Sequence, residues 1–271
     1  MFEWIKHFYK KDNNNSTEEK ALEPVIITIH GYGRRRKHEF DNFASWGKQD
    51  GFEIIQFDMY DLFDENDHHW LTWVSRAKEV IDSYKNSGRD IYLAGFSMGG
   101  VIASYLACVC PVKRLLLIAP AFSYVNLDTI TGVISKSASN LMNSEKKEEI
   151  ELPRSFYNAF TDVIKNLKKY IEKVNCPVYI LHGNQDEVIS VKSSLWAYQK
   201  IPHSRKSLVI IHGGHHRLLM DEQISWTVYQ NMKLFFQGKI LPDQDIIMQK
   251  DIMPSLLEEK KRREAQKEKP F

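Results

Sequence analysis

Cysteine is scarce in this chain, which holds three cysteines among 271 residues. Cys108 and Cys110 stand close together and Cys176 stands alone, so the set is odd and lacks the spacing of a disulfide framework. Small secreted domains depend on disulfides, whereas thiols stay reduced inside cells. We therefore expect free, buried or half-buried thiols in a reducing compartment.

Long apolar runs are also absent. No stretch approaches the roughly 20 apolar residues that a membrane-spanning helix needs. Residues 1–11 include apolar side chains, but Glu3, Lys6 and His7 interrupt them, which argues against a signal peptide. These features predict a cytoplasmic protein. An alternative is that residues 1–11 form an amphipathic surface helix that contacts a membrane rather than docking on the protein itself.

An excess of charge of one sign is missing as well. Lys and Arg together number 37 and Asp and Glu number 35, a formal net charge of +2, so the body of the chain gives no reason to expect a nucleic-acid partner. The ten histidines form no His-x-x-x-His pair on a helix with a third ligand, and no glycine-rich loop has nucleotide-binding spacing. We expect no metal, no cofactor and a small-molecule partner, and the sequence leaves the oligomeric state open.

The chain does contain a regular alternation of short apolar runs and helical stretches. Short runs rich in β-branched residues are typical of buried strands. The runs occupy residues 25–29, 53–58, 90–94, 114–118, 177–181 and 208–211, and helical stretches between them include residues 39–49, 70–87 and 101–109. This alternation predicts an α/β protein with a mostly parallel sheet flanked by helices.

Composition divides the chain into a core and three other parts. Charged or polar stretches at the two ends read as a linker and a tail. The parts are residues 1–23 (N-terminal segment and linker), 24–121 and 175–238 (α/β core), 122–174 (insertion) and 239–271 (charged tail).

The insertion at residues 122–174 interrupts the alternation, because it holds no convincing strand. Its amphipathic helical stretches cover residues 129–142, 145–151 and 155–174. We expect a small helical cap that covers a site at the sheet edge. The alternative is a scaffold that packs on the sheet.

A candidate nucleophile lies between the run at 90–94 and the helical stretch at 101–109. Ser97 is the centre of the segment Gly-Phe-Ser-Met-Gly at residues 95–99. A strand that turns this tightly into a helix forces its serine into a strained backbone conformation, and the two glycines remove side chains that would collide. The turn also directs the N-terminus of the helix at developing negative charge. The alternative is a turn serine whose glycines serve packing.

A serine hydroxyl needs a base to act as a nucleophile near neutral pH. His215 and His216 both follow the run at 208–211, and both qualify by position. A histidine on a loop at one strand end can reach a serine at another strand end.

A third group must hold the imidazole in the correct tautomer. Asp186, just after the run at 177–181, is the first choice, and the neighbouring Glu187 is the second. Serine, aspartate and histidine then follow one another in the order that accompanies such a serine turn. The alternative for Asp186 is a turn carboxylate that caps the helix starting near residue 190.

The segment His-Gly-Tyr-Gly at residues 30–33 follows the run at 25–29. We expect an oxyanion hole made by the backbone N–H groups of Tyr32 and of Met98, which follows the nucleophile. His30 is expected to hold the loop by a hydrogen bond rather than to take part in the chemistry.

These four segments, in this order and at these strand ends, resemble the α/β-hydrolase superfamily, and most closely its carboxylesterase and monoacylglycerol lipase branch. The likeness covers residues 24–237 and includes the His-Gly-x-x-Asp segment at 182–186. In that branch the histidine precedes an apolar pair, which favours His216 over His215 and completes a triad with Ser97. The resemblance implies a broad-specificity serine carboxylesterase that acts on short-to-medium acyl esters through an acyl-enzyme and has a helical cap.

Other functions fit the same residues. A monoacylglycerol lipase, a thioesterase or a peptidase would use the same triad, because the substrate pocket rather than the triad selects the carbonyl compound. A lipase that meets lipid through residues 1–11 and the cap is a further alternative. A non-catalytic binding protein on the same fold is the alternative from another class, and the presence of every triad member argues against it.

Two groups of side chains bear on the substrate. Phe122 and Tyr124, at the entry to the insertion, are the candidate substrate-binding residues, whereas most other aromatic side chains are expected in the core. The basic run at residues 34–37 would favour an acidic substrate if it faced the site, and the alternative is that it faces water.

Overall fold

The computed structural model describes residues 22–123, 152–240 and 246–249. Within these residues, seven strands form one sheet in the order β2-β1-β3-β4-β5-β6-β7, and every neighbouring pair is parallel. The sheet confirms the predicted α/β fold. The strands are β1 (Val25–Ile29), β2 (Glu53–Ile55), β3 (Ile91–Phe96), β4 (Val112–Ile118), β5 (Val178–Gly183), β6 (Lys206–Ile211) and β7 (Ile246–Gln249).

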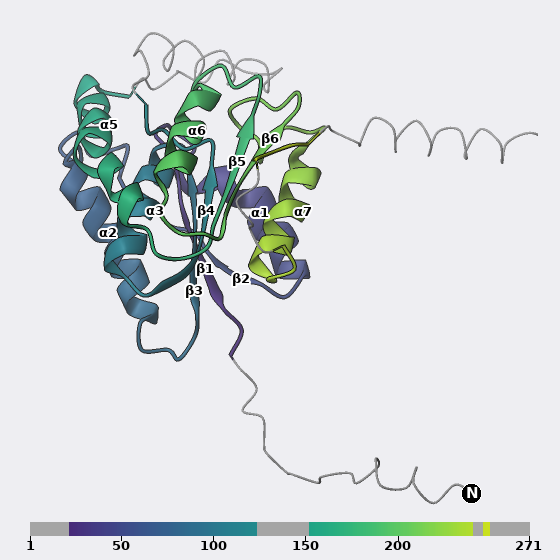
Figure 1. Cartoon of the computed structure of the whole chain (residues 1–271). Coiled ribbons are helices and arrows are strands. Elements are labelled where there is room, and N and C mark those ends of the chain that lie inside the picture. Colours follow the sequence, from purple (N-terminus) through teal and green to yellow (C-terminus); the bar gives the residue numbers. More distant parts are fainter. Residues whose placement is uncertain (1–21, 124–151, 241–245, 250–271) are drawn as a thin grey trace, which may run out of the picture.

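Helices cover both faces of this sheet (Figure 1). Side chains that alternate along each strand bury into two separate apolar clusters, as a pleated strand requires. The first cluster joins the sheet to α2 (Trp70–Tyr84), α3 (Met98–Val109), α5 (Arg154–Leu167) and α6 (Val191–Lys200). The second joins it to α1 (Asp41–Gln49) and α7 (Ser225–Phe236). The 3₁₀ helices η2 (Arg36–Phe40) and η3 (Lys168–Lys173) complete the described elements.

All six runs predicted as strands form β1 to β6. The run at 53–58 is a strand only at its start, because its later residues bond the segment after β1 instead. Gln56 Nε2 donates to Lys37 O at 2.9 Å, and Asp58 Oδ1 accepts from Lys37 N at 3.1 Å. The chain therefore leaves the sheet early to support the loop that follows β1.

Strand β7 was not predicted, and it lies within residues 239–271, which the sequence indicates as a charged tail. Its backbone pairs in parallel with β6 over residues 246–249. Its two isoleucines favour a strand, but the run is so short that pairing with the edge of the existing sheet decides its structure. Tertiary context, which local composition does not reveal, therefore extends the sheet by one strand.

Helix α5 and the 3₁₀ helix η3 form the described helical part of the predicted cap. The buried side chains of α5 recur at helical spacing and join the cluster that also contains α2 and α3. The buried positions are Phe156, Ala159, Phe160, Val163, Ile164 and Leu167. The helices expected at 129–142 and 145–151 lie outside the described residues, so the extent of the cap remains a prediction.

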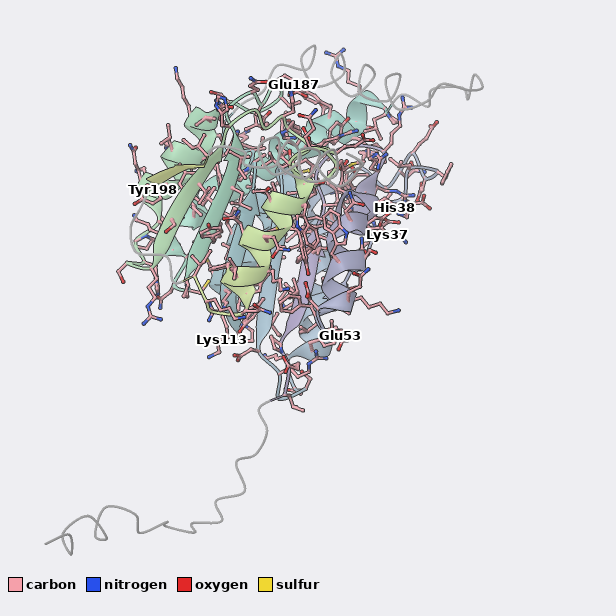
Figure 2. The ribbon with its side chains drawn as sticks, turned by 90° about the vertical axis from the view of Figure 1, so that its right-hand side faces the viewer. Lys37, His38, Glu53, Lys113, Glu187 and Tyr198 are labelled. Carbon is pink, nitrogen blue, oxygen red and sulfur yellow. The ribbon has the colours of Figure 1, made fainter. Side chains whose placement is uncertain are left out.

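The parallel sheet places all strand carboxyl ends at one edge, where ligands bind in open α/β sheets. Figure 2 shows Glu187, just after β5, at one end of the molecule, whereas Glu53 and Lys113, near the starts of β2 and β4, lie at the other. The segments predicted to carry the site follow β1, β3, β5 and β6, so they meet at the same end.

All three cysteines are free thiols, with Cys176 buried and Cys108 and Cys110 half-buried, as predicted. Among the helices of the described residues, none has the length and apolar character needed to cross a membrane.

Candidate active site

The turn between β3 and α3 holds Ser97 in a strained conformation. Its φ is 53° and its ψ is −118°, in a part of the backbone map that residues with side chains rarely adopt. A Cβ on Gly95 would lie 2.6 Å from Gly99 O, and a Cβ on Gly99 would lie 2.0 Å from Ile29 O. Only glycine fits at either position, so the predicted strained turn is confirmed.

Two glycines bring the loops after β5 and β6 together. A Cβ on Gly183 would lie 2.0 Å from Gly214 O, so the two backbones are in direct contact. Gln185 N also donates to Gly214 O at 2.9 Å. These contacts hold the loop that carries the candidate acid beside the loop that carries the candidate base.

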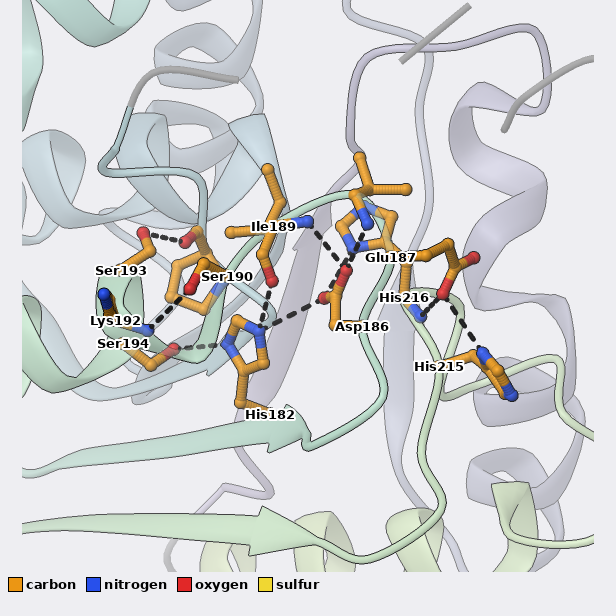
Figure 3. A network of polar contacts seen from close by, with 12 residues as sticks. His182, Asp186, Glu187, Ile189, Ser190, Lys192, Ser193, Ser194, His215 and His216 are labelled. Carbon is orange, nitrogen blue, oxygen red and sulfur yellow. Dashed lines mark hydrogen bonds and ion pairs between the residues drawn. The ribbon is translucent and has the colours of Figure 1, made fainter. Parts of the chain in front are cut away.

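The side chains of His216 and Asp186 form a buried pair (Figure 3). His216 Nδ1 lies 2.8 Å from Asp186 Oδ2. Because Nδ1 faces a carboxylate, it carries the proton and leaves Nε2 as an acceptor. Burial by itself raises the pKa of Asp186, but attraction to His216 and hydrogen bonds from His182 and His216 bring that pKa well below its usual range. The carboxylate is therefore ionised at neutral pH, as an orienting group must be.

The rival base and acid also pair with each other. His215 Nδ1 lies 3.1 Å from Glu187 Oε2. The side chains of this pair are 56% and 38% exposed, against 9% and 0% for His216 and Asp186. An exposed pair is screened by water and contributes little, whereas a buried one is rigid and electrostatically strong. Burial therefore favours His216 and Asp186 as the catalytic pair.

The base lies next to the nucleophile turn. The ring of His216 packs on Phe96, the residue before Ser97, with ring centroids 4.9 Å apart. Between the described residues, no hydrogen bond joins the Ser97 hydroxyl to His216. Catalytic hydrogen bonds commonly tighten only when substrate binds, so the geometry is compatible with proton transfer between the two.

The loop after β1 lies against the nucleophile. A Cβ on Gly31 would lie 3.0 Å from the Cβ of Ser97. The amides of Tyr32 and Met98 have no hydrogen-bond acceptor among the described residues, and Met98 opens α3, whose N-terminus favours negative charge. The Tyr32 ring stacks on Phe160 of α5 at 5.3 Å, so this loop also contacts the described part of the predicted cap.

His30 and Tyr60 fix the backbone of this loop. His30 Nε2 accepts from Met59 N at 2.9 Å, and its Nδ1 lies 2.8 Å from Gly31 O, which assigns the proton to Nδ1. Tyr60 Oη accepts from Gly33 N and donates to Gly33 O, both at 2.8 Å. The structural role expected for His30 agrees with these bonds, whereas no local sequence pattern links Tyr60 to the loop.

The stability of the protein is expected to fall as pH drops from about 6.5 to about 4, because His30 is buried. Burial lowers the pKa of His30 from 6.5 to about 4. Between these values the unfolded chain binds a proton that the folded chain excludes, so lower pH favours unfolding, by about 2 kcal/mol at pH 5. Urea unfolding at pH 7 and pH 5 should show this loss in the wild type and a smaller loss in His30→Gln. An identical pH dependence in both proteins would contradict the assignment to His30.

The substrate-binding candidates have different positions. Phe122 is almost fully buried and packs on Trp196 of α6, with ring centroids 5.7 Å apart. Ser193 Oγ accepts from Phe122 N at 2.8 Å and donates to Pro120 O at 2.7 Å, which ties the end of β4 to α6. Tyr124 lies outside the described residues. A role for either aromatic side chain in binding substrate remains a prediction.

Part of the basic run is neutralised within the fold. Arg36 Nη1 lies 3.4 Å and Lys37 Nζ 3.6 Å from Asp58 Oδ2. Glu39, which is buried, pairs with Arg217 Nε at 3.7 Å, next to His216.

No group of three or more metal-ligating side chains is arranged to hold a metal ion in the described part of the chain.

Comparison with known sequences places the chain near lipases. The family described as serine aminopeptidase, S33 (Hydrolase_4) matches residues 145–223, which include Asp186 and His216 but not Ser97. The monoglyceride lipase of Saccharomyces cerevisiae is 24% identical over 77% of this chain and 82% of its own length. The thermostable monoacylglycerol lipase of Bacillus sp. strain H-257 is 22% identical over 60% of this chain and 69% of its own length.

Solved structures share the fold. A soluble variant of the monoglyceride lipase from Saccharomyces cerevisiae superposes with a TM-score of 0.62 at 18% identity, over 83% of this chain and 88% of that chain. Est1E from Butyrivibrio proteoclasticus superposes with a TM-score of 0.59 at 22% identity, over 82% of this chain and 90% of that chain. At these identities the likeness establishes the fold alone.

Proposed function

We infer that this α/β-hydrolase, a serine ester hydrolase resembling the monoacylglycerol lipase branch, cleaves carboxylic esters of short-to-medium acyl length through an acyl-enzyme. The observation that carries the proposal is the buried His216–Asp186 pair beside the strained Ser97 turn. A buried, correctly polarised imidazole is what a serine hydroxyl needs to become a nucleophile.

In the proposed reaction, Ser97 Oγ attacks the ester carbonyl carbon while His216 Nε2 takes its proton. The amides of Tyr32 and Met98 stabilise the resulting oxyanion. The bond to the alkoxy oxygen then breaks, and His216 returns the proton to the leaving alcohol. Water repeats the cycle on the acyl-enzyme, releasing the carboxylic acid and restoring the Ser97 hydroxyl.

A monoacylglycerol lipase is the second candidate, because both curated relatives described above carry that activity in their names. The two candidates share every catalytic step and differ in the alcohol that leaves and in the acyl length that the pocket accepts. Thioesters and peptides remain the alternatives if neither ester class is cleaved.

The test begins with a fluorophosphonate probe, which labels activated serines whatever the acyl specificity. Labelled protein, with the serine blocked, is the control for all turnover assays. We expect the unblocked protein to hydrolyse p-nitrophenyl esters between acetyl and dodecanoyl, with 1-monoacylglycerols of matched acyl length measured in parallel.

A preference for monoacylglycerols over p-nitrophenyl esters of equal acyl length would favour the lipase candidate. Labelling without hydrolysis of any ester would contradict ester cleavage and direct attention to acyl thioesters and peptide amides. Absence of both labelling and turnover would support the binding-protein alternative.

A further inference from the structure

A second buried histidine contacts the proposed catalytic acid (Figure 3). His182, the next-to-last residue of strand β5, is fully buried, and its Nε2 lies 3.2 Å from Asp186 Oδ2. This is the same carboxylate oxygen that faces His216. His182 has no part in the proposed chemistry, so its contact with the acid needs an explanation of its own.

The proton positions on His182 follow from its partners. Nε2 also lies 2.9 Å from Ile189 O, and a carbonyl oxygen can only accept a hydrogen bond. Nε2 therefore carries a proton, which it donates to Ile189 O, and the same N–H group lies beside the carboxylate. Nδ1 lies 2.7 Å from Ser194 Oγ, so in the neutral ring the Ser194 hydroxyl donates to Nδ1.

The other oxygen of the carboxylate is held equally firmly. Asp186 Oδ1 accepts from Val188 N at 2.8 Å and from Ile189 N at 2.7 Å. Ile189 thus donates to the acid through its N–H and accepts from His182 through its carbonyl. The acid, Ile189 and His182 form a closed ring that fixes the carboxylate plane.

We propose that His182, held by Ser194, is a positioning residue that keeps Asp186 ionised and aimed at His216. The inference rests on the proposed function, because it assigns Asp186 the role of orienting acid. A carboxylate with no exposed surface needs donors on both oxygens to remain charged. Without His182, the ring of His216 would be the only side chain with an N–H beside Oδ2. The orientation of the carboxylate would then depend on the same imidazole that the carboxylate must orient.

The chain also offers a matched pair of variants. His182→Leu removes the donor and keeps most of the bulk, whereas His182→Gln supplies an amide N–H near the position of Nε2. Ser194→Ala removes only the hydroxyl that donates to His182 Nδ1. Ser207→Ala is the control, since Ser207 is a buried serine on β6 outside this network.

The measured quantity is the second-order rate constant of fluorophosphonate labelling, which reports serine activation without an acyl substrate. We expect His182→Leu to lower it about 10- to 100-fold, the range that one hydrogen bond to a charged group supplies. Ser194→Ala should lower it by roughly 3- to 10-fold, and Ser207→Ala should not change it. His182→Gln should recover most of the loss, and with esters the effect should fall on kcat rather than KM.

The outcomes separate this inference from the proposed function. Failure of the wild type to label would refute the proposed function itself. If the wild type labels, then a folded His182→Leu that labels at the wild-type rate, or equal losses in the Leu and Gln variants, would overturn the positioning role. Should His182→Leu fail to fold, equal rates for Ser194→Ala and Ser207→Ala would overturn it instead.

Discussion

Replacing Ser97 by alanine is expected to lower kcat about 10⁶-fold, and replacing His216 by alanine should cost about as much. The two groups act as one unit, since the Ser97 hydroxyl is a weak nucleophile without the base, and His216 has no hydroxyl proton to accept without Ser97. The double variant should therefore be no slower than either single variant. Initial rates with the best p-nitrophenyl ester, normalised to folded protein, would measure the three losses.

His215→Ala is the matched control, because it removes a neighbouring imidazole that is mostly exposed. We expect it to change kcat by no more than about threefold, as is usual for truncating an exposed ion pair. A large loss in His215→Ala with retained activity in His216→Ala would reverse the assignment of the base. Additive losses in the double variant would instead mean that Ser97 and His216 do not work as a unit.

The position of the site at the sheet edge was predictable, because each of its segments carries a local signal. Ser97 stands between two glycines at positions where any Cβ would collide with the backbone, so the glycines beside Ser97 indicate the strained turn. Asp186 and the histidines each follow a short apolar run that forms a parallel strand. Parallel strands end at one edge, so segments far apart in the sequence meet there.

The choice between adjacent residues was not predictable from composition alone. His215 and His216 each pair with a carboxylate. The family resemblance favours His216, and within the structure the burial of its pair with Asp186 distinguishes the two histidines. Burial depends on how Phe96 and the β5 loop surround the imidazole, which is a property of the assembled fold.

Supporting contacts were missed for a similar reason. Tyr60 reaches the loop after β1 from a distant position, and Ser194 reaches His182 from the first turns of α6. Such hydrogen bonds between separate elements leave no periodic or motif signal in the chain. The pairing of β7 with β6 is a further example, since an edge strand is decided by its neighbour.

Asp186→Asn is expected to lower kcat about 10⁴-fold. The substitution places a hydrogen-bond donor where the wild type has the acceptor that faces His216, and it leaves the shape of the site unchanged. Only one orientation of the asparagine side-chain amide satisfies its neighbours. Val188 N and Ile189 N both donate to Oδ1, so the asparagine oxygen must take that position and the NH₂ must replace Oδ2. A donor would then face His216 Nδ1 and stabilise the tautomer with its proton on Nε2, which cannot accept a proton from Ser97.

Glu187→Gln is the control for this prediction, because it removes the adjacent carboxylate. Glu187 Oε2 accepts from His216 N at 3.3 Å and from the His215 ring, and both bonds survive with an amide oxygen. We expect its kcat to stay within about threefold of the wild type, as for other exposed charges. The reverse pattern, with Asp186→Asn active and Glu187→Gln inactive, would assign the orienting role to the exposed pair. In that case Asp186 would not be the orienting acid, and His182 would have no catalytic group to position. The two carboxylate variants therefore test whether the buried network of His182 and Asp186 contributes to catalysis.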